Sequence, residues 1–357
     1  MTKVRVGILG SGFISMTHAE ALRYDPRAEL VAIAGGSRAK SLAQDYSVQA
    51  MSSVEEMLHH PDIDAVIIGT PHHLHAEATI VAARQGKHVL VEKPMATTVE
   101  DCRAMIEVAR DADVRLMVAH FQRYRKTNMA VKQALESGVL GRVYMINDVL
   151  IENPDETGWK TQADSKGFLL GYGIHAVDHL RWWLASEVES VAAQCGRYEG
   201  EPAEDGSLLL LKFRNGTSAI LQSTNAWPFK RVIGSPGAAE FRAHLIGEKG
   251  VLEVNVYGQV ILKTSEGTTV LSELPSWSDP KSFARIEAYA EQDKEFISSI
   301  IEHRQPAIPG QEGLENVRIC LAAYQASDEQ GTIHLDGKIC PPQSCAGIKI
   351  LVGVEGR

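Results

Sequence analysis

The chain has 357 residues, of which 44% are hydrophobic and 23% charged, and its net charge at pH 7 is −9. This composition is typical of a folded protein with room for two cores, and it excludes disorder. The sequence has no long basic block, which excludes nucleic acid as an expected partner. It has no apolar run long enough to span a bilayer, which excludes a membrane. Five cysteines without a framework spacing and no signal-peptide pattern favour a cytoplasmic protein.

The first 122 residues alternate short, almost continuous apolar runs with segments of helical periodicity. Such runs predict strands buried on both faces of a parallel sheet. The repeated strand–helix–strand order therefore predicts a doubly wound α/β domain over residues 1–122. The predicted strands are Val4–Leu9, Leu30–Ala34, Ala65–Ile68, His88–Val91 and Arg115–Ala119, and the predicted helices are Phe13–Leu22, Arg38–Asp45, His75–Gln85 and Val99–Asp111.

The pattern changes after about residue 127. Alternating residues and hairpin-like turns predict an α+β domain with an open, mostly antiparallel sheet over residues 123–335. The predicted strands are Arg142–Ile151, Val188–Arg197, Leu208–Phe213, Ser218–Thr224, Glu240–Ile246, Gly250–Val256 and Val260–Lys263, and the predicted helices are Asn128–Glu136, His175–Leu184, Ser282–Glu302 and Gly313–Glu329. Residues 336–357 form a tail to which the sequence assigns no structure.

A glycine-rich turn, with Gly10 and Gly12 in the pattern G-x-G-x-x-S, separates the first predicted strand from the first helix. Gly10 permits a tight turn, Gly12 lets the backbone approach a pyrophosphate, and the helix N-terminus offers N–H groups to the anion. The alternative is a glycine turn that binds no nucleotide. The strand–turn–helix context favours dinucleotide binding, and we expect Phe13 and Ile14 beside the cofactor.

The end of the second predicted strand contains no carboxylate and reads Ala34-Gly35-Gly36-Ser37-Arg38. An NAD site usually has Asp or Glu here to bond the ribose 2′-hydroxyl, whereas an NADP site must accept a phosphate. Ser37 can donate a hydrogen bond and Arg38 can pair with the dianion, although an exposed Arg that opens a helix is also common. The missing acid favours NADP, with NAD as the alternative.

Two residues have the chemistry to act on a substrate hydroxyl. Lys93 follows a predicted parallel strand, so its ammonium is expected to face the cofactor crevice and to polarise a substrate oxygen, although an isolated lysine is more often simply exposed. His175 opens a predicted helix, and its neutral imidazole is suited to accept the hydroxyl proton.

His175, Asp178 and His179 share one face of that predicted helix, at positions i, i+3 and i+4. A metal site is one alternative for this set, but no complete ligand motif accompanies it, so we predict no metal. For His179 a structural role is as well supported as a role in a site.

Several motifs together give the chain a resemblance to a known family. Besides the glycine turn, they are Thr70-Pro71-His72-His73-Leu74-His75, Glu92-Lys93-Pro94, His120-Phe121-Gln122-Arg123 and Gly171-Tyr172-Gly173-Ile174-His175-Ala176-Val177-Asp178. Apart from the tail, the chain resembles the Gfo/Idh/MocA oxidoreductases. The resemblance implies an N-terminal Rossmann domain and a C-terminal α/β domain whose open sheet contacts substrate on one side and often forms an oligomer interface on the other.

The resemblance also implies roles for individual residues. Lys93 and His175 would be catalytic, Lys93 beside the nicotinamide. The cofactor would further contact the residues Thr70, Pro71, His72, His75, Glu92 and Gln122. The substrate would contact Lys93, Arg123, Tyr124, Trp159, Tyr172, His175, Asp178 and Asn225. The aromatic residues and the loop residue Asn225 are included because of their expected place near the pocket and their side-chain chemistry.

One position departs from the family pattern. Many active members have Asp four residues before the catalytic histidine, where this chain has Gly171. His175 therefore lacks one partner that would hold its tautomer and raise its pKa. His175 and Lys93 alone, or another acid such as Asp178, would have to support the chemistry, or else the substrate differs from those of the polyol dehydrogenases.

These observations predict an NAD(P)-dependent oxidoreductase, with NADP favoured, that acts on a secondary alcohol or ketone of a sugar, glycoside, polyol or cyclic dihydrodiol. Two alternatives are a dinucleotide-binding regulator without turnover and an NAD-dependent glycosidase. By resemblance we expect a homodimer or homotetramer.

Overall fold

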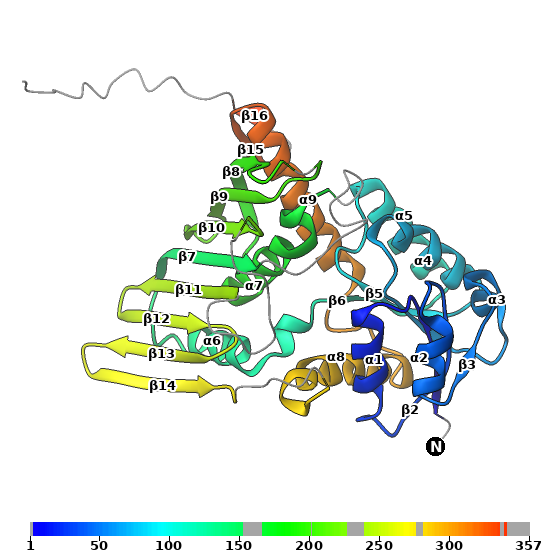
Figure 1. The fold of residues 1–357 in the computed structure, drawn as a ribbon. Coiled ribbons are helices and arrows are strands. Elements are labelled where there is room, and N and C mark those ends of the chain that lie inside the picture. The colour runs from blue at the N-terminus through cyan, green and yellow to red at the C-terminus, as the bar shows by residue number, and fades with distance from the viewer. Residues whose placement is uncertain are drawn as a thin grey trace, which may run out of the picture.

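A computed structural model of the chain describes residues 3–152, 166–200, 202–226, 239–275, 281–335 and 339–340. These residues form two sheets (Figure 1), the N-terminal sheet A and the larger sheet B. The predicted fold class is confirmed: sheet A is parallel throughout, and sheet B is mostly antiparallel.

Sheet A has the strand order β3-β2-β1-β4-β5-β6. Its central strands are almost wholly buried, because helices cover both faces of the sheet and continuous apolar runs can pack on each. The chain order reverses between β1 and β4, and ligands of open α/β sheets bind at such a switch point. The strands are β1 (Val4–Leu9), β2 (Ala28–Ala34), β3 (Gln49–Ala50), β4 (Ala65–Ile68), β5 (His88–Glu92) and β6 (Leu116–Ala119).

Two helices of this part, α3 and α5, begin at side-chain caps. Ser53 Oγ accepts the Glu56 N–H at 3.0 Å at the start of α3, and Thr98 Oγ1 accepts the Asp101 N–H at 3.1 Å at the start of α5. The helices are α1 (Phe13–Leu22), α2 (Ala39–Asp45), α3 (Val54–His59), the 3₁₀ turn η1 (His72–Leu74), α4 (His75–Arg84) and α5 (Val99–Asp111).

Sheet B has the strand order β14-β13-β12-β11-β7-β10-β9-β8-β15-β16, in which only the β7–β10 pair is parallel within the described residues. Burial alternates along β9, so one face packs on the core and the other is open. The strands are β7 (Val143–Glu152), β8 (Val188–Gly196), β9 (Gly206–Phe213), β10 (Ser218–Thr224), β11 (Ala239–Gly247), β12 (Gly250–Asn255), β13 (Gln259–Thr264), β14 (Gly267–Glu273), β15 (Thr332–His334) and β16 (Ile339–Cys340).

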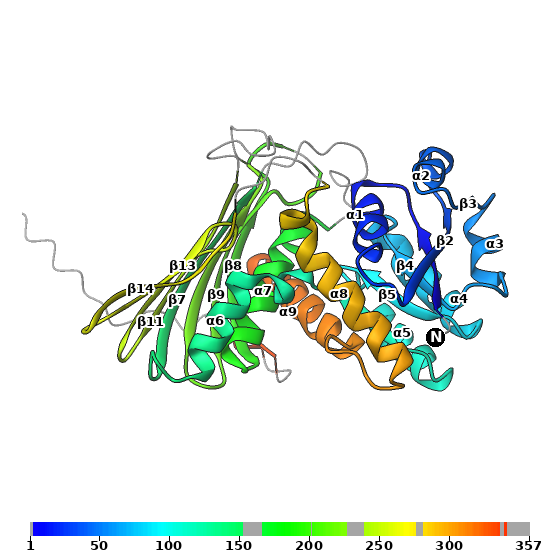
Figure 2. The same ribbon diagram turned by 90° about the horizontal axis from the view of Figure 1, so that it is seen from below.

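A layer of helices lies between the two sheets, as Figure 2 shows. One of them, α8, packs along α1 of the N-terminal part, and the α8–α9 connection joins the edge of sheet A, where the Val118 N–H donates to the Ile308 carbonyl at 3.0 Å. The elements of this layer are η2 (Phe121–Tyr124), α6 (Lys126–Glu136), the π-helical turn η5 (Leu169–Gly173), α7 (Ile174–Leu184), α8 (Phe283–Ile301) and α9 (Gly310–Asp328).

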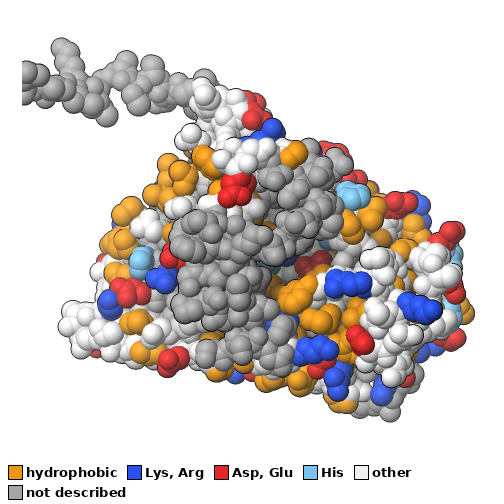
Figure 3. All heavy atoms as spheres, in the orientation of Figure 1, with side chains coloured by type: hydrophobic (Ala, Val, Ile, Leu, Met, Phe, Trp, Pro, Cys, Tyr) orange, Lys and Arg blue, Asp and Glu red, His pale blue; other side chains and the backbone are white. Residues whose placement is uncertain are grey.

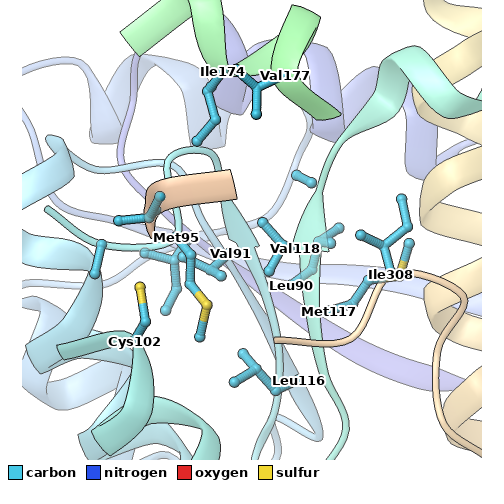
Figure 4. Packing of buried hydrophobic residues seen from close by; sticks show 14 of the residues in the cluster. Leu90, Val91, Met95, Cys102, Leu116, Met117, Val118, Ile174, Val177 and Ile308 are labelled. Carbon is cyan, nitrogen blue, oxygen red and sulfur yellow. The ribbon is translucent and has the colours of Figure 1, made fainter. Parts of the chain in front are cut away.

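One connected hydrophobic core runs from sheet A into this layer. Figure 4 shows its junction, with Leu90, Val91, Met95, Leu116, Val118, Ile174 and Val177 among the buried side chains. Gly313 allows α9 to approach closely, because a Cβ there would lie 2.7 Å from Val118 Cγ2. Sheet A and α9 are therefore packed against each other, and α7 packs on α9.

All strands and helices predicted from the sequence are present, with ends shifted by up to three residues. The sequence did not predict β3, α3, β14, β15, β16 or the short turns. The reason is plain for β14, which is exposed along nearly its whole length and shows no apolar alternation. The strand β16 lies within the tail, where it pairs with β15. The domain boundaries at 122/123 and 335/336 stay predictions.

The described surface carries charges of both signs. In Figure 3 basic and acidic side chains are interspersed over the coloured part of the visible face, and hydrophobic ones gather along the left margin, where sheet B lies. Among the described helices, none combines the length and apolar character that crossing a membrane requires.

Candidate active site

The turn between β1 and α1 has the geometry that a dinucleotide requires. Gly10 has φ +106°, and a Cβ there would lie 2.4 Å from the Gly69 carbonyl oxygen. Gly12 is the N-cap of α1, makes no side-chain capping bond, and would have nothing within 4 Å of an added Cβ. The N–H groups at this helix end thus remain open to an anion, so the residues present fit a pyrophosphate group.

Polar atoms along the same edge of sheet A support this fit. The hydroxyl oxygens of Ser15 and Thr70 are buried and have no hydrogen-bond partner among the described residues. Ile14, Pro71 and His72 are partly buried beside them, whereas the Phe13 ring is 45% exposed.

The end of β2 is open and free of carboxylates. Gly35 and Gly36 both have positive φ, and the Arg38 N–H donates to Ser11 Oγ at 3.2 Å. The side chains of Ser37 and Arg38 are exposed next to this turn. A basic and a hydroxyl side chain therefore stand where an NAD site would have its acid.

Lys93 follows the last residue of β5. Its Nζ donates to the Gly171 carbonyl oxygen at 2.8 Å and lies 4.7 Å from the centre of the Tyr172 ring. The structure therefore brings the lysine to the segment that carries the family's aspartate position. Gly171 lies in the π-helical turn η5, a feature common at functional sites, and gives the lysine a backbone carbonyl in place of a carboxylate.

His175 lies at the start of α7 in apolar surroundings. It is 6% exposed, and its ring meets the Phe121 ring edge-on with 5.3 Å between centres. Its Nδ1 is buried without a partner among the described residues. Burial lowers the pKa of His175 well below its usual value, and the charges of Lys93 and His120 act in the same direction. The imidazole is therefore neutral at pH 7 and able to accept a proton.

Asp178 and Arg123, both predicted to contact substrate, are bonded to each other. The guanidinium holds the carboxylate through two hydrogen bonds of 2.9 and 2.7 Å, and Asn316 donates a third at 2.7 Å. Burial raises the pKa of Asp178, but Arg123 and His120 more than offset this and lower it. Arg123 also pairs with Glu312 at 2.6 Å. Asp178 is therefore ionised and bonded to Arg123, and it makes no hydrogen bond to His175.

Other predicted site residues have partners inside the protein. The ring nitrogens of His75 lie 2.8 Å from the Pro94 carbonyl and 2.9 Å from the Thr70 carbonyl. Gln122 donates to Tyr257 at 3.1 Å and accepts from Arg125 at 2.9 Å. For both residues, a cofactor contact through these atoms would need a rearrangement.

The remaining predictions for substrate contacts are mixed. Tyr172 stacks on Phe168, with 5.0 Å between ring centres, beside Lys93. The hydroxyl of Tyr124 and Oδ1 of Asn225 are buried without a partner among the described residues. Trp159 lies outside the described residues. All substrate roles stay predictions.

His179 pairs with Asp148 at 2.6 Å and packs on Trp183, so the structural alternative for this histidine matches its surroundings. No group of three or more His, Cys, Asp or Glu side chains that could hold a metal occurs in the part of the chain that the structure describes.

Sequence reasoning missed two buried residues that are connected to Lys93 through Glu92. His18 of α1 contacts Glu92 and also Asp293 of α8. A signal existed for His18, which continues the apolar positions of α1 at i+4 from Ile14 and i−4 from Leu22. No local pattern marks Asp293, which is 275 residues away along the chain.

The open turn, the switch point, the lysine and the neutral histidine define an oxidoreductase that binds a nicotinamide dinucleotide. The family described as "Oxidoreductase family, NAD-binding Rossmann fold" matches residues 4–120, and the "GFO/IDH/MocA C-terminal domain" matches residues 128–253. The chain belongs to the Gfo/Idh/MocA family of oxidoreductases.

Named relatives and solved structures agree with this assignment. A 1,5-anhydro-D-fructose reductase of Ensifer adhaerens is 32% identical over 78% of this chain and 82% of its own length. An inositol 2-dehydrogenase of Rhizobium meliloti is 28% identical over 93% and 99%. The structure of an Agrobacterium radiobacter oxidoreductase, in complex with NAD⁺, L-tartaric acid and magnesium, has a TM-score of 0.83 and 21% identity over 93% and 98%, and shows the same fold.

Proposed function

We propose that the protein transfers a hydride between NADP(H) and a secondary alcohol or ketone of a sugar, glycoside, polyol or cyclic dihydrodiol. The observation that carries the proposal is the meeting of Lys93, at the end of β5, and the neutral His175 at one segment, Gly171–His175. An ammonium donor and a neutral base are the two groups that this chemistry needs.

The bound nicotinamide would supply or accept the hydride at its C4 atom. In the oxidation, Lys93 would donate a hydrogen bond to the substrate oxygen and stabilise its developing negative charge. His175 would take up the hydroxyl proton, so the substrate loses one hydride and one proton and becomes a ketone. In the reduction, the imidazolium form of His175 would return that proton. The neutral imidazole suits the oxidation at neutral pH, and the imidazolium that the reduction uses becomes more populated as the pH falls.

The substrate class is supported by the names of relatives. The reductase from Ensifer adhaerens acts, by its name, on a cyclic anhydroketose, and the Rhizobium meliloti enzyme on inositol. Both substrates pair a ring with a secondary hydroxyl or ketone. The residues that we propose for substrate contact are Lys93, Arg123, Tyr124, Trp159, Tyr172, His175, Asp178 and Asn225.

The test is a calorimetric titration with NADP and NAD, followed by absorbance at 340 nm with a panel of anhydroketoses, polyols, sugars and dihydrodiols. Turnover of any of them with a dinucleotide supports the proposal. Tight binding without turnover across the panel would favour a regulator. Tightly retained NAD together with glycoside cleavage would favour a glycosidase, and either result would contradict the proposal.

The preference for NADP rests on Ser37 and Arg38, which stand exposed at the end of β2. Replacing Arg38 with Ala is expected to weaken NADP binding about tenfold and to leave NAD binding unchanged, because only the 2′-phosphate pairs with the guanidinium. The measurement is the ratio of the two dissociation constants. Equal weakening of both cofactors would contradict the role of Arg38, and tighter binding of NAD by the unmodified protein would contradict the preference.

We also propose that the protein forms a homodimer or homotetramer. On the open face of sheet B, Leu208, Leu210 and Ile220 are 47%, 55% and 50% exposed, and Leu210 and Ile220 are paired neighbours. An apolar group on an open sheet face is typical of an interface. A monomeric mass in light scattering would contradict this proposal.

A further inference from the structure

A buried ionic cluster joins α1, the end of β5 and α8. His18 Nδ1 lies 3.0 Å from both carboxylate oxygens of Asp293, and His18 Nε2 lies 3.2 Å from Glu92 Oε1. The three residues are at most 5% exposed. Both ring nitrogens face acceptors, and only the imidazolium form can donate from both.

The charges in the cluster agree with this geometry. Burial lowers the pKa of His18, but the charges and hydrogen bonds of Asp293 and Glu92 outweigh it and raise the pKa to about 10. Burial raises the pKa of Glu92, and the contact with His18 more than reverses that effect. At neutral pH a charged imidazolium therefore faces an ionised Glu92.

Glu92 connects His18 with the backbone of Lys93. Its second carboxylate oxygen, Oε2, accepts the backbone N–H of Lys93 at 3.1 Å. On the other side of the turn, the Pro94 carbonyl lies 2.8 Å from His75. The residues Glu92 to Pro94 are thus held by a charged histidine from α1 on one side and by a second buried histidine on the other.

The same cluster is connected to both parts of the site. His18 lies six residues after Gly12, about 9 Å along the helix whose N-terminus fits the pyrophosphate. The ring of Tyr289 meets His18 edge-on and stacks on Phe121, whose ring in turn meets His175. The cluster therefore connects the Lys93 turn with the cofactor helix and, through two aromatic rings, with His175.

Stability is a weak reason for such a cluster. Removing charges from water costs several kcal/mol for each ion, so an apolar replacement of a buried ionic group is often neutral or stabilising. The cluster instead fixes the orientation of its side chains, because each hydrogen bond holds one side chain relative to another.

We propose that His18 and Asp293 are positioning residues: through the Glu92 carboxylate they hold the Lys93 turn in place relative to α1 and to a dinucleotide bound there. The inference rests on the proposed function, because hydride transfer is the reaction that a displaced lysine would slow.

The test compares Asp293→Asn with Asp148→Asn in the full chain. Both changes replace a buried carboxylate that faces a histidine with a neutral amide, but Asp148 pairs with His179 and makes no hydrogen bond to the Lys93 turn. We expect Asp293→Asn to lower kcat about 10²-fold, since small displacements of a catalytic group have effects of this size. The dissociation constant of NADP should change less than about threefold, because a positioning role affects the reaction more than binding. Asp148→Asn should leave kcat within the same narrow range.

Amide hydrogen exchange of the peptide around Lys93 gives a readout that needs no turnover. Exchange should become faster in Asp293→Asn and stay unchanged in Asp148→Asn. If Asp293→Asn does not fold, His18→Gln, which keeps one donor toward Glu92, takes its place. Unchanged kcat and unchanged exchange in a folded variant would overturn the inference. An unmodified protein that transfers no hydride would overturn the proposed function instead, and the exchange comparison would then decide the inference alone.

Discussion

Lys93 and His175 approach the same segment of the chain, and their surroundings differ in almost every electrostatic respect. The Lys93 turn is bonded to ionised and polar groups: Glu92, the charged His18 behind it, and the Gly171 carbonyl. His175 is buried against the rings of Phe121 and His120 and has an unpaired Nδ1 among the described residues.

This difference suits the two tasks that the proposed reaction gives to Lys93 and His175. A donor that must stay charged is held best by fixed acceptors, whereas a base that must stay neutral at pH 7 is served by burial. The ionic contacts keep the lysine turn in place, and burial lowers the pKa of His175. The absent carboxylate at Gly171 belongs to the same arrangement, since an acid there would favour the charged imidazole.

The largest effect on kcat is expected when the charge of Lys93 is removed. Lys93→Met keeps the length of the side chain and removes the ammonium, so kcat should fall about 10³-fold while NADP binding is retained. Steady-state kinetics and a binding titration measure both quantities. Lys263→Met, on sheet B, is the matched control and should behave like the unmodified protein. A comparable loss of NADP affinity in Lys93→Met would contradict the role of the lysine.

Replacing the neutral His175 should lower kcat somewhat less. His175→Asn removes the base and is expected to lower kcat about 10²-fold. In the unmodified protein, the lowered pKa of His175 predicts that the rate of alcohol oxidation stays level as the pH falls to 6.5 and declines only below it. The exposed His244 on β11 provides the control variant His244→Asn. A decline of the oxidation rate that begins above pH 6.5 would contradict the neutral environment.

The comparison also explains how far sequence reasoning reached. The sequence points to Lys93 and His175 because Lys93 follows a recognisable strand, His175 opens a recognisable helix, and both carry suitable chemistry. Their partners could not be found in the same way: Asp293 meets His18, and Asn316 meets Asp178, only after helices α8 and α9 have folded back over sheet A. A single sequence contains no signal for such long-range pairs.

The fold was easier to predict than the site for a physical reason. Buried parallel strands such as Ala65–Ile68 show their burial in every residue, so composition alone reveals them. Arg123 and Asp178 illustrate the opposite case. Polar residues in a motif were predicted to contact substrate, yet their charges are bonded to each other. Residue type and motif position indicate a site, but they leave open which polar atoms are already satisfied.

A third prediction concerns Glu204, which is bonded to the turn η5 that precedes His175. Glu204 accepts the Leu169 N–H at 2.8 Å at the start of η5, and burial raises its pKa to about 7. The folded state therefore binds a proton more tightly than the unfolded state, and the free energy of unfolding should fall as the pH rises from about 4.5 to about 7. Glu204→Gln keeps a carbonyl acceptor and cannot ionise, so at pH 8 it should stabilise the protein by roughly 2 kcal/mol.

Urea unfolding at pH 5 and pH 8 measures this effect. The variant should differ from the unmodified protein at pH 8 and much less at pH 5, where Glu204 is already protonated in the folded state. The same gain at both pH values would show that ionisation of Glu204 is not its cause.

The smallest effect is expected from a change at Gly171, which is bonded to Lys93 and lies four residues before His175. Gly171→Asp introduces the missing carboxylate at a position where an added Cβ would meet only His72 Cε1 at 3.6 Å, an ordinary contact. The protein should fold, and kcat at pH 8 should change less than about tenfold, because Lys93 keeps the backbone carbonyl as an acceptor. The new negative charge should raise the pKa of His175 and move the decline of the oxidation rate to higher pH. An unmoved pH profile in the folded variant would mean that the charge at position 171 does not act on His175, and the neutral state of this histidine would then depend on burial and on Lys93 alone.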